Sequence, residues 1–175
     1  MMEVKYRGKR ITVEGGPVRL PNGLETTAER VVFPPVVTVL ALHDGDVLFV
    51  RQYRPALGRY TLELPSGVVA DGETPEDAAA RELEEETGFK PTSLELLFKG
   101  IVSPGYSTEV AHIFLARDTI PGRISPEPYE VIEVVKIPLS EACEKAHKME
   151  IEDLRATAAL ALYCAKLNKI DFDNY

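Results

Sequence analysis

The segment Gly72–Phe89, GETPEDAAARELEEETGF, constrains the fold of this chain more than any other stretch. Thr74 can cap the N-terminus of a helix and Pro75 suits its first turn. Gly88 suits the left-handed position just past a helix end. The pattern therefore predicts a helix with well-defined ends between these residues.

Four glutamates crowd the last turn of this predicted helix: Glu82, Glu84, Glu85 and Glu86. Each costs about 0.3–1 kcal/mol against the helix dipole, and like charges at i and i+4 repel each other. At roughly 100° per residue, Glu82, Glu85 and Glu86 share one face, while Leu83 points to the other side and can pack on a sheet. Clustered carboxylate oxygens favour a hard divalent cation such as Mg²⁺. The crowding indicates a metal site; the alternative is a solvated charged face.

The spacing around these glutamates resembles the Nudix box. Five residues separate Gly67 from Glu73, and seven separate Glu73 from Arg81. The remaining fixed positions of the box are filled by Glu82, Leu83, Glu85, Glu86, Gly88 and Phe89. The resemblance implies an α+β fold, a Nudix-type α/β/α sandwich with a mixed sheet, and hydrolysis of a nucleoside diphosphate linked to another moiety.

The resemblance also implies roles for individual residues. Glu82 and Glu86 match metal-binding positions, and Glu85 matches a third carboxylate on the metal side. Arg81 matches the arginine that orients these carboxylates, and Ser66 would contribute its backbone carbonyl. The implied cofactor is Mg²⁺, with Mn²⁺ as the alternative, in two or three ions that bridge the phosphates and activate water.

A general base for that water is expected in the segment SPEPYEVIEVV. In the enzymes that this chain resembles, the base is a glutamate in the loop before the last strand, often within an acidic triplet. Here Pro128 and Tyr129 interrupt the acids. Glu130 aligns best with the metal-proximal acid, and Glu127 is the alternative.

The flanks of the box resemble the ADP-ribose pyrophosphatase subgroup, which implies that the products are AMP and ribose 5-phosphate. Its marker proline is matched by Pro104, sixteen residues after Gly88 and followed by Gly105. Upstream of the box, Arg51 and Arg54 offer guanidinium groups to phosphate oxygens, or form surface ion pairs. Glu63 is expected to bind the nucleoside side of the substrate or to tie down a loop. The candidate substrate-binding residues are Arg51, Arg54, Glu63, Pro104 and Gly105.

Three alternatives to ADP-ribose hydrolysis remain open. Another nucleotide sugar, such as GDP-mannose or ADP-glucose, is the nearest. A non-catalytic module that binds ADP-ribose would be expected to have a damaged box, and this box is intact. The third alternative is an isomerase acting on prenyl diphosphates, which by resemblance would use a cysteine and a glutamate as its acid pair. Here Cys143 and Cys164 lie far along the chain from the box.

The chain divides into an N-terminal antiparallel β meander (1–33) and a Nudix hydrolase domain (34–175). Asp44-Gly45 predicts a hairpin turn between strands near Val36–Leu42 and Val47–Tyr53. Further strands are expected in YTLELPSG, SLELLFKGIV, TEVAHIFLAR and EVIEVVKIPL, and two helices near Ser140–Met149 and Ile151–Leu167. The segment Asp118–Tyr129, with three prolines, is expected to be the longest loop.

The composition limits the classes of binding partner and the cellular location that we expect for this chain. Asp and Glu outnumber Lys and Arg by 28 to 20, a net charge of −8 that argues against nonspecific binding to nucleic acid or an anionic membrane. No apolar run approaches the ~20 residues that span a bilayer, and the first residues lack an apolar signal core. A cytoplasmic location is expected, with Cys143 and Cys164 as buried free thiols.

The meander is too short to bury a core of its own, so it must pack on something else. The resemblance implies a homodimer in which the partner's N-terminal strands complete the active site. The alternative is that the meander folds back onto its own chain.

Overall fold

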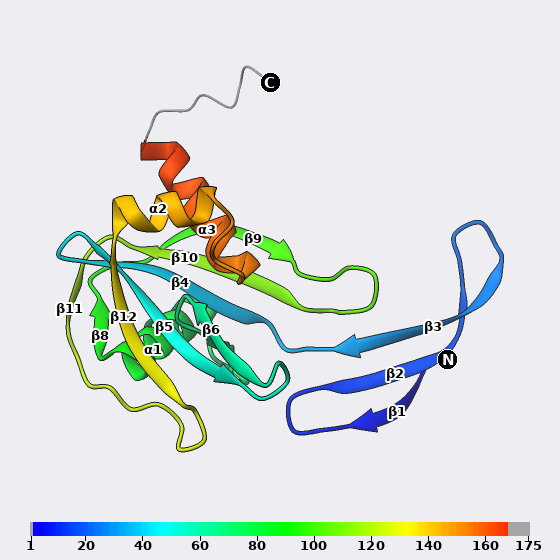
Figure 1. Ribbon diagram of the computed structural model, residues 1–175. Helices are drawn as coiled ribbons and strands as arrows, with labels where there is room; N and C mark the ends of the chain where they lie inside the picture. Colours follow the sequence, from blue (N-terminus) through cyan, green and yellow to red (C-terminus); the bar gives the residue numbers. More distant parts are fainter. Residues whose placement is uncertain (1, 168–175) are drawn as a thin grey trace.

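Strands dominate the computed structural model, which describes residues 2–167 (Figure 1). A seven-stranded sheet forms its centre, and a three-stranded sheet at the N-terminus stands to one side. In chain order the elements are β1 (Glu3–Arg7), β2 (Thr12–Arg19), β3 (Glu25–Val32), β4 (Val36–His43), β5 (Asp46–Arg54), β6 (Arg59–Glu63), β7 (Ser66–Val68), α1 (Pro75–Thr87), β8 (Phe89–Pro91), β9 (Glu95–Ile101), β10 (Val110–Ala116), β11 (Thr119–Pro121), β12 (Ile132–Pro138), α2 (Leu139–His147) and α3 (Leu154–Leu167).

Helices cover both faces of the large sheet. Side chains of β4 alternate between these faces, as strand geometry requires. Val37 and Val39 pack in the cluster that contains Leu83 of α1, whereas Leu40 packs in the cluster that contains Leu160 of α3. All five side chains are buried. The predicted α/β/α sandwich is confirmed.

The large sheet is mixed, as predicted. Its order is β12-β5-β4-β10-β9, with β6 along β5 and β7 along β4. Among the described strands of this sheet, β4 and β10 are the only parallel neighbours, from Val36 opposite Ala111 to Ala41 opposite Ala116. A parallel pair needs a crossover, and α1 lies in the crossover between β4 and β10. The acidic helix therefore packs beside the centre of the sheet.

The hairpin predicted at Asp44-Gly45 is confirmed. Asp44 has φ 50° and Gly45 has φ 88°. Positive φ at both central residues is typical of the tight turn that matches the twist of two antiparallel strands. The turn joins β4 to β5, with Leu42 opposite Val47.

The N-terminal sheet has the order β1-β2-β3, which confirms the predicted antiparallel meander. Two details differ from the expectation. A glycine pair weakens a strand, but β2 runs through Gly15-Gly16 because β3 pairs with it along its whole length. In addition, Glu3–Arg7 forms β1, a strand that its charged sequence did not indicate. Both faces of β1 are exposed, including Val4 and Tyr6.

The expectation of free cysteines is wrong. Cys143 of α2 and Cys164 of α3 form a disulfide, with Cα atoms 6.0 Å apart. The physical reason is tertiary: α2 and α3 pack against each other and bring together two residues that are 21 positions apart in the sequence. None of the helices in residues 2–167 has the length and apolar character needed to cross a bilayer.

Candidate active site

The helix α1 presents the acidic cluster because its ends are fixed by local contacts. The Thr74 hydroxyl accepts a hydrogen bond from the Asp77 amide at 3.1 Å, which caps the N-terminus. Gly88 takes the left-handed conformation with φ 75° and ends the helix. No basic residue stands in the last turn to offset the glutamates. Both predicted helix ends are confirmed.

Gly67 is required by a close approach. A Cβ atom built at this residue would lie 1.9 Å from the carboxyl carbon of Glu82. The strand β7 therefore passes directly against the acidic face of α1. Any side chain at this position would displace the Glu82 carboxylate.

Arg81 joins three carboxylates on this face. Its guanidinium donates to both Glu73 oxygens at 2.8 and 3.0 Å, to Glu82 at 2.7 Å and to Glu85 at 3.0 Å. Glu73 also accepts from the Ala70 amide at 3.0 Å, so it holds the preceding loop against the helix. These contacts are the ones that an arginine orienting metal ligands would make.

Glu86 is the most buried of the carboxylates, with 2% of its surface exposed. Its carboxylate accepts a hydrogen bond from the Ser66 amide at 3.0 Å. Burial, together with the charges of Glu82 and Glu130, raises the pKa of Glu86 to about 8, and the hydrogen bond from Ser66 opposes this shift. Burial also raises the pKa of Glu82, although Arg81 opposes this shift. Two neighbouring carboxylates thus resist ionisation unless a cation accompanies them.

The donor chemistry of this cluster fits a divalent cation. In residues 2–167, no group of three or more acidic, histidine or cysteine side chains is arranged to hold a metal ion. Mg²⁺ needs only one or two carboxylates from a protein and completes its shell with water and substrate phosphates. Glu82 and Glu86 are the carboxylates that could hold it, and Glu85 shares Arg81 with Glu82.

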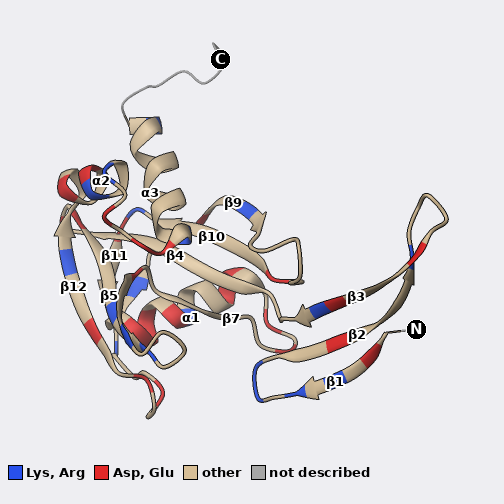
Figure 2. Ribbon diagram, turned by 45° about the vertical axis from the view of Figure 1, so that its right-hand side comes forward, with Lys and Arg blue, Asp and Glu red and all other residues tan. Residues whose placement is uncertain are grey.

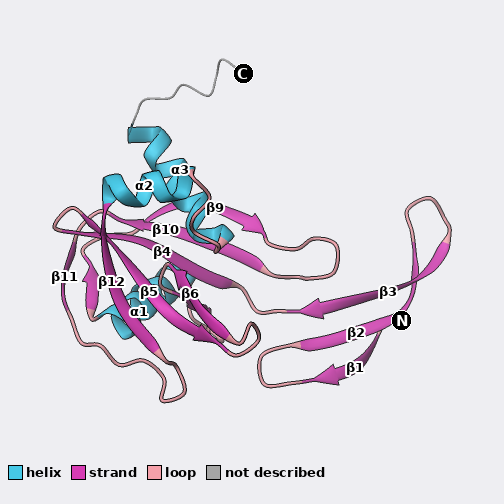
Figure 3. Ribbon diagram, in the orientation of Figure 1, coloured by secondary structure: helices cyan, strands magenta, loops and turns pink. Residues whose placement is uncertain are grey.

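The structure brings Glu130, rather than Glu127, toward this cluster. The charge of Glu130 raises the pKa of both Glu82 and Glu86, so its carboxylate lies near enough to act on them electrostatically. Glu127 is exposed, and its amide donates to the Glu130 carboxylate at 3.1 Å. The segment expected as one long irregular loop also contains a short strand, because β11 pairs with β8 (Figure 3).

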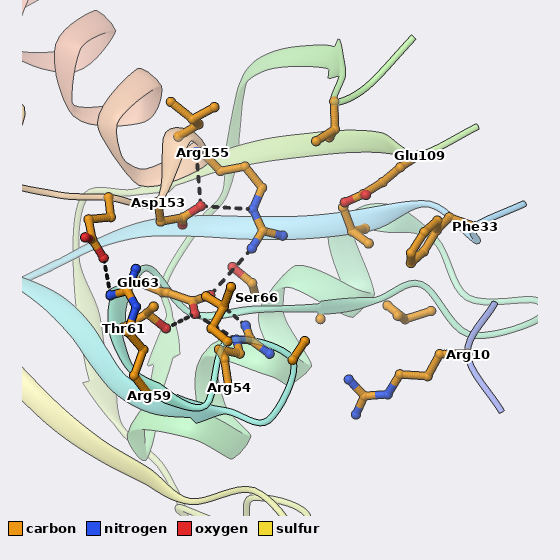
Figure 4. Close-up of a pocket in the computed structure, with 18 residues that line it drawn as sticks. Arg10, Phe33, Arg54, Arg59, Thr61, Glu63, Ser66, Glu109, Asp153 and Arg155 are labelled. Atoms are coloured by element: carbon orange, nitrogen blue, oxygen red, sulfur yellow. Dashed lines mark hydrogen bonds and ion pairs between the residues drawn. The ribbon is translucent and has the colours of Figure 1, made fainter. Parts of the chain in front are cut away.

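Ser66, whose amide bonds to Glu86, lines a pocket of about 800 Å³ (Figure 4). Ser66 and Gly67 line it on the side of α1, and Glu109 lines it at the start of β10. Its walls carry several arginines: Arg10, Arg54, Arg59 and Arg155. A cavity with this lining suits an anionic ligand of nucleotide size.

Inside the pocket Arg54 and Glu63 form a two-bonded ion pair, with N–O distances of 2.7 and 2.6 Å. The Thr61 hydroxyl donates to Glu63, and Arg155 lies 3.5 Å from the same carboxylate. Figure 4 shows these side chains pointing toward one another from β5, β6 and α3. Burial alone would raise the pKa of Glu63, but these donors hold it below its ordinary value.

Arg51, Pro104 and Gly105 do not line this pocket. Arg51 lies 3.3 Å from Glu133 and stacks over the Tyr60 ring at 4.1 Å. Pro104 and Gly105 belong to the connection from β9 to β10, which is tied to β3 by backbone hydrogen bonds at Val31.

Several pocket residues escaped the sequence analysis. Asp153 and Arg155 were placed inside a helix expected from Ile151, but α3 begins at Leu154. Asp153 precedes it, accepts from the Ala156 amide at 3.3 Å and contacts the Arg155 guanidinium at 3.4 Å. The aspartate before a helix was a visible capping signal, whereas nothing local placed Arg155 beside Glu63.

Comparison with known proteins adds four findings. The model of the NUDIX domain matches residues 32–160. An ADP-ribose pyrophosphatase of Bacillus subtilis is 35% identical over 89% of this chain and 85% of its own length. A methanol dehydrogenase activator of Bacillus methanolicus is 30% identical over the same shares of the two chains. The crystal structure of an ADP compounds hydrolase superposes with a TM-score of 0.84 at 27% identity, covering 97% of this chain and 92% of that one.

Proposed function

Because the chain belongs to the Nudix family, we propose that it hydrolyses the pyrophosphate bond of ADP-ribose to give AMP and ribose 5-phosphate. One observation carries the proposal: Ser66 and Gly67, which line the pocket of about 800 Å³, lie directly against the carboxylates of Glu86 and Glu82. The first of these carboxylates is buried and the second half-buried, and the charge of Glu82 raises the pKa of Glu86. The similar Bacillus subtilis protein, an ADP-ribose pyrophosphatase, supports this substrate.

In the proposed mechanism, Arg54 binds the diphosphate. Its guanidinium is held in the pocket by Glu63 and can offer its remaining donors to phosphate oxygens. Arg81 keeps Glu82 and Glu85 on the side of α1 that faces the pocket. Glu130 accepts the proton of the attacking water, which must reach a phosphorus from the side of the acidic cluster.

Glu82 and Glu86, with Glu85 beside them, would hold Mg²⁺ or Mn²⁺. When bound, the metal would neutralise the charge that develops on the phosphates. Before any metal binds, Arg81 restrains Glu82, whereas Glu86 is restrained by the Ser66 amide.

A substrate panel tests the proposal. We expect ADP-ribose with Mg²⁺ to give the highest kcat/KM among ADP-ribose, ADP-glucose, GDP-mannose, diadenosine polyphosphates and NAD, with products identified by chromatography. Several substrates are compared because the two relatives that each cover 89% of this chain have names that indicate different roles. Preference for another nucleotide sugar would keep the chemistry and change the substrate. Binding of ADP-ribose without hydrolysis of any compound would favour the non-catalytic module.

The meander supports our proposal of a homodimer. Val4 and Tyr6 of β1 are 48% and 58% exposed, and a second copy packed against the meander would cover such exposed apolar side chains. We expect light scattering to give a dimeric mass, and Tyr6→Asp to shift it toward the monomer. A monomeric mass for the unaltered chain would contradict the proposal. That the partner's strands complete the active site stays a prediction, since Arg10 of this chain already reaches its own pocket.

We propose a cytoplasmic location. The bond between Cys143 and Cys164 must then persist in a compartment where disulfides are rare outside hyperthermophiles. Alkylation of free thiols before cell lysis, followed by mass spectrometry of the cytosolic fraction, should find both cysteines protected. Recovery of the protein outside the cytosol would contradict the location.

A further inference from the structure

The loop that carries Glu130 is anchored firmly at both ends. On one side the Gly122 amide donates to the Gly88 carbonyl at 2.8 Å, and the Ser125 amide donates to the Glu85 carbonyl at 2.9 Å. On the other side the Tyr53 amide donates to the Val131 carbonyl at 3.0 Å. Between these anchors, residues 126–130 form a short span in front of the acidic cluster.

Backbone contacts within this span do not fix it to the rest of the molecule. The Glu130 amide donates to the Glu127 carbonyl at 2.8 Å, and the Glu127 amide donates to the Glu130 side chain. Both bonds join residues of the span to each other. They hold the span together but do not attach it to another element.

One side-chain contact ties the span to another element. The Lys9 ammonium donates to the Tyr129 hydroxyl at 3.1 Å and lies 4.3 Å from the centre of the Tyr129 ring. Among the hydrogen bonds and ion pairs of residues 2–167, no other joins residues 126–130 to a different part of the chain. The contact combines a hydrogen bond with attraction between a cation and an aromatic ring.

Lys9 stands on the turn between β1 and β2, which is basic (Figure 2). A hydrogen bond of 2.8 Å from the Gly8 amide to the Ile11 carbonyl closes this turn. The next residue, Arg10, lines the pocket. The turn therefore touches the pocket with one residue and the Glu130 loop with its neighbour.

We propose that Lys9 is a positioning residue for hydrolysis and that it holds Glu130 in place through Tyr129. The proposal rests on the proposed role of Glu130 as general base. Tyr129 and Glu130 are adjacent, so a displacement of one backbone unit moves the other with it. The N-terminal meander thereby sets the position of the base as well as contributing surface for a second subunit.

Two measurements on the full-length protein test this contact. Lys9→Met removes the charge and the donor while keeping the length of the side chain. The matched control is Lys5→Met, because Lys5 lies on the same meander and pairs with Glu3 at 2.9 Å. Without substrate or metal, hydrogen exchange should show faster exchange of the Glu127 and Glu130 amides, the two that are hydrogen-bonded within the span, in Lys9→Met and unchanged exchange in the control.

With ADP-ribose and Mg²⁺, kcat should fall about three- to tenfold in Lys9→Met while KM changes little, because the base moves and the substrate contacts do not. In Tyr129→Phe, kcat should fall less than in Lys9→Met, because the aromatic ring that the Lys9 ammonium contacts remains. The double variant should be no worse than Lys9→Met, as expected of two residues in one contact. Lys9→Arg should restore most of the activity.

Each outcome decides a separate question. If hydrogen exchange of the loop amides is unchanged in Lys9→Met, Lys9 does not hold the loop. If exchange is faster in Lys9→Met but kcat equals that of the Lys5→Met control, the contact exists but does not position the base. If the native protein does not hydrolyse ADP-ribose, the proposed function fails, while the exchange measurement still tests whether Lys9 holds the loop.

Discussion

Glu86 and Glu63 are buried glutamates of the same active site, with 2% and 5% of their surfaces exposed, yet their pKa values shift in opposite directions. Burial opposes ionisation in both. Glu63 receives two bonds from Arg54 and one from Thr61, and these donors keep it ionised. Glu86 receives one backbone amide, from Ser66, and faces other carboxylates.

The comparison shows that burial alone does not identify a metal ligand; the partners do. A buried carboxylate whose charge is matched by an arginine stabilises the scaffold. One that is left facing other carboxylates is stable as an anion only when a cation arrives from outside the chain. The predictions below test this difference, from the largest expected effect to the smallest.

The carboxylates of the acidic cluster should carry the largest effect on activity: Glu86, whose only donor within residues 2–167 is the Ser66 amide, and Glu82, which shares Arg81 with two other carboxylates. We expect Glu86→Gln and Glu82→Gln each to lower turnover at least about 100-fold, or roughly 2.7 kcal/mol of transition-state stabilisation, because each removes a charged metal ligand. Steady-state hydrolysis of ADP-ribose at saturating Mg²⁺ measures this, and circular dichroism confirms folding. Near-normal turnover in both variants would remove the metal-site interpretation.

Glu130, the proposed general base, should also be needed for activity. We expect Glu130→Gln to lower kcat about 100-fold with little change in KM, since a general base is lost and the binding contacts remain. Glu127→Gln is the matched control, because this exposed residue is the alternative base and should tolerate the change. If both variants and their combination keep full activity, the base lies elsewhere.

The matched glutamate should matter for stability instead. We expect Glu63→Gln to lower the free energy of unfolding by about 2 kcal/mol, below the usual cost of breaking a buried ion pair because both arginines are partly exposed. Glu86→Gln should leave the metal-free protein as stable as before, or more so. Urea unfolding in the absence of metal measures both. Equal losses of unfolding free energy in the two variants would contradict the proposed difference between Glu63 and Glu86.

The pH dependence of stability should separate the two residues further. A carboxyl whose folded pKa is raised, to about 8 for Glu86, favours the folded state below its unfolded pKa of about 4.3, and this contribution is lost as the pH rises to 8. The lowered pKa of Glu63 acts in the opposite sense: its contribution is present at neutral pH and lost in acid.

In the metal-free protein, the melting temperature should therefore fall between about pH 5 and 8, and Glu86→Gln should flatten this slope. Millimolar Mg²⁺ should raise the melting temperature most near pH 8, where the ligands ionise with least cost. Scanning calorimetry across this range measures the slope. A metal-independent melting temperature at pH 8 would contradict the assignment.

Short-range signals explain which parts of the molecule the sequence predicts. Thr74 and Gly88 define the helix α1 through contacts within a few residues, and Asp44-Gly45 defines a hairpin. The acidic face follows from helix periodicity alone. These features need no knowledge of the rest of the fold, and the structure confirms them.

Long-range contacts explain what the sequence does not predict. The pairing of Cys143 with Cys164 depends on how α2 packs on α3, and the contact of Arg155 with Glu63 depends on where α3 meets β6. Likewise, the strand β1 is highly charged and acquires its extended form by pairing with β2. Patterns in the sequence name the residue types at a site, but chain topology decides which of them meet.

The crossover between β4 and β10 also has a consequence for how the chain folds. The strands β4, β5 and β7 and the helix α1 are close in sequence, and the Ser66–Glu86 contact lies within this unit. By contrast, β10 must close a long stretch of chain before it can pair with β4, and β12 returns later still with Glu130 just before it. Local contacts form faster than those that close long loops. We therefore expect the metal-binding half to assemble before the general base arrives: Leu83→Ala should slow refolding, whereas Val134→Ala should mainly accelerate unfolding in stopped-flow measurements.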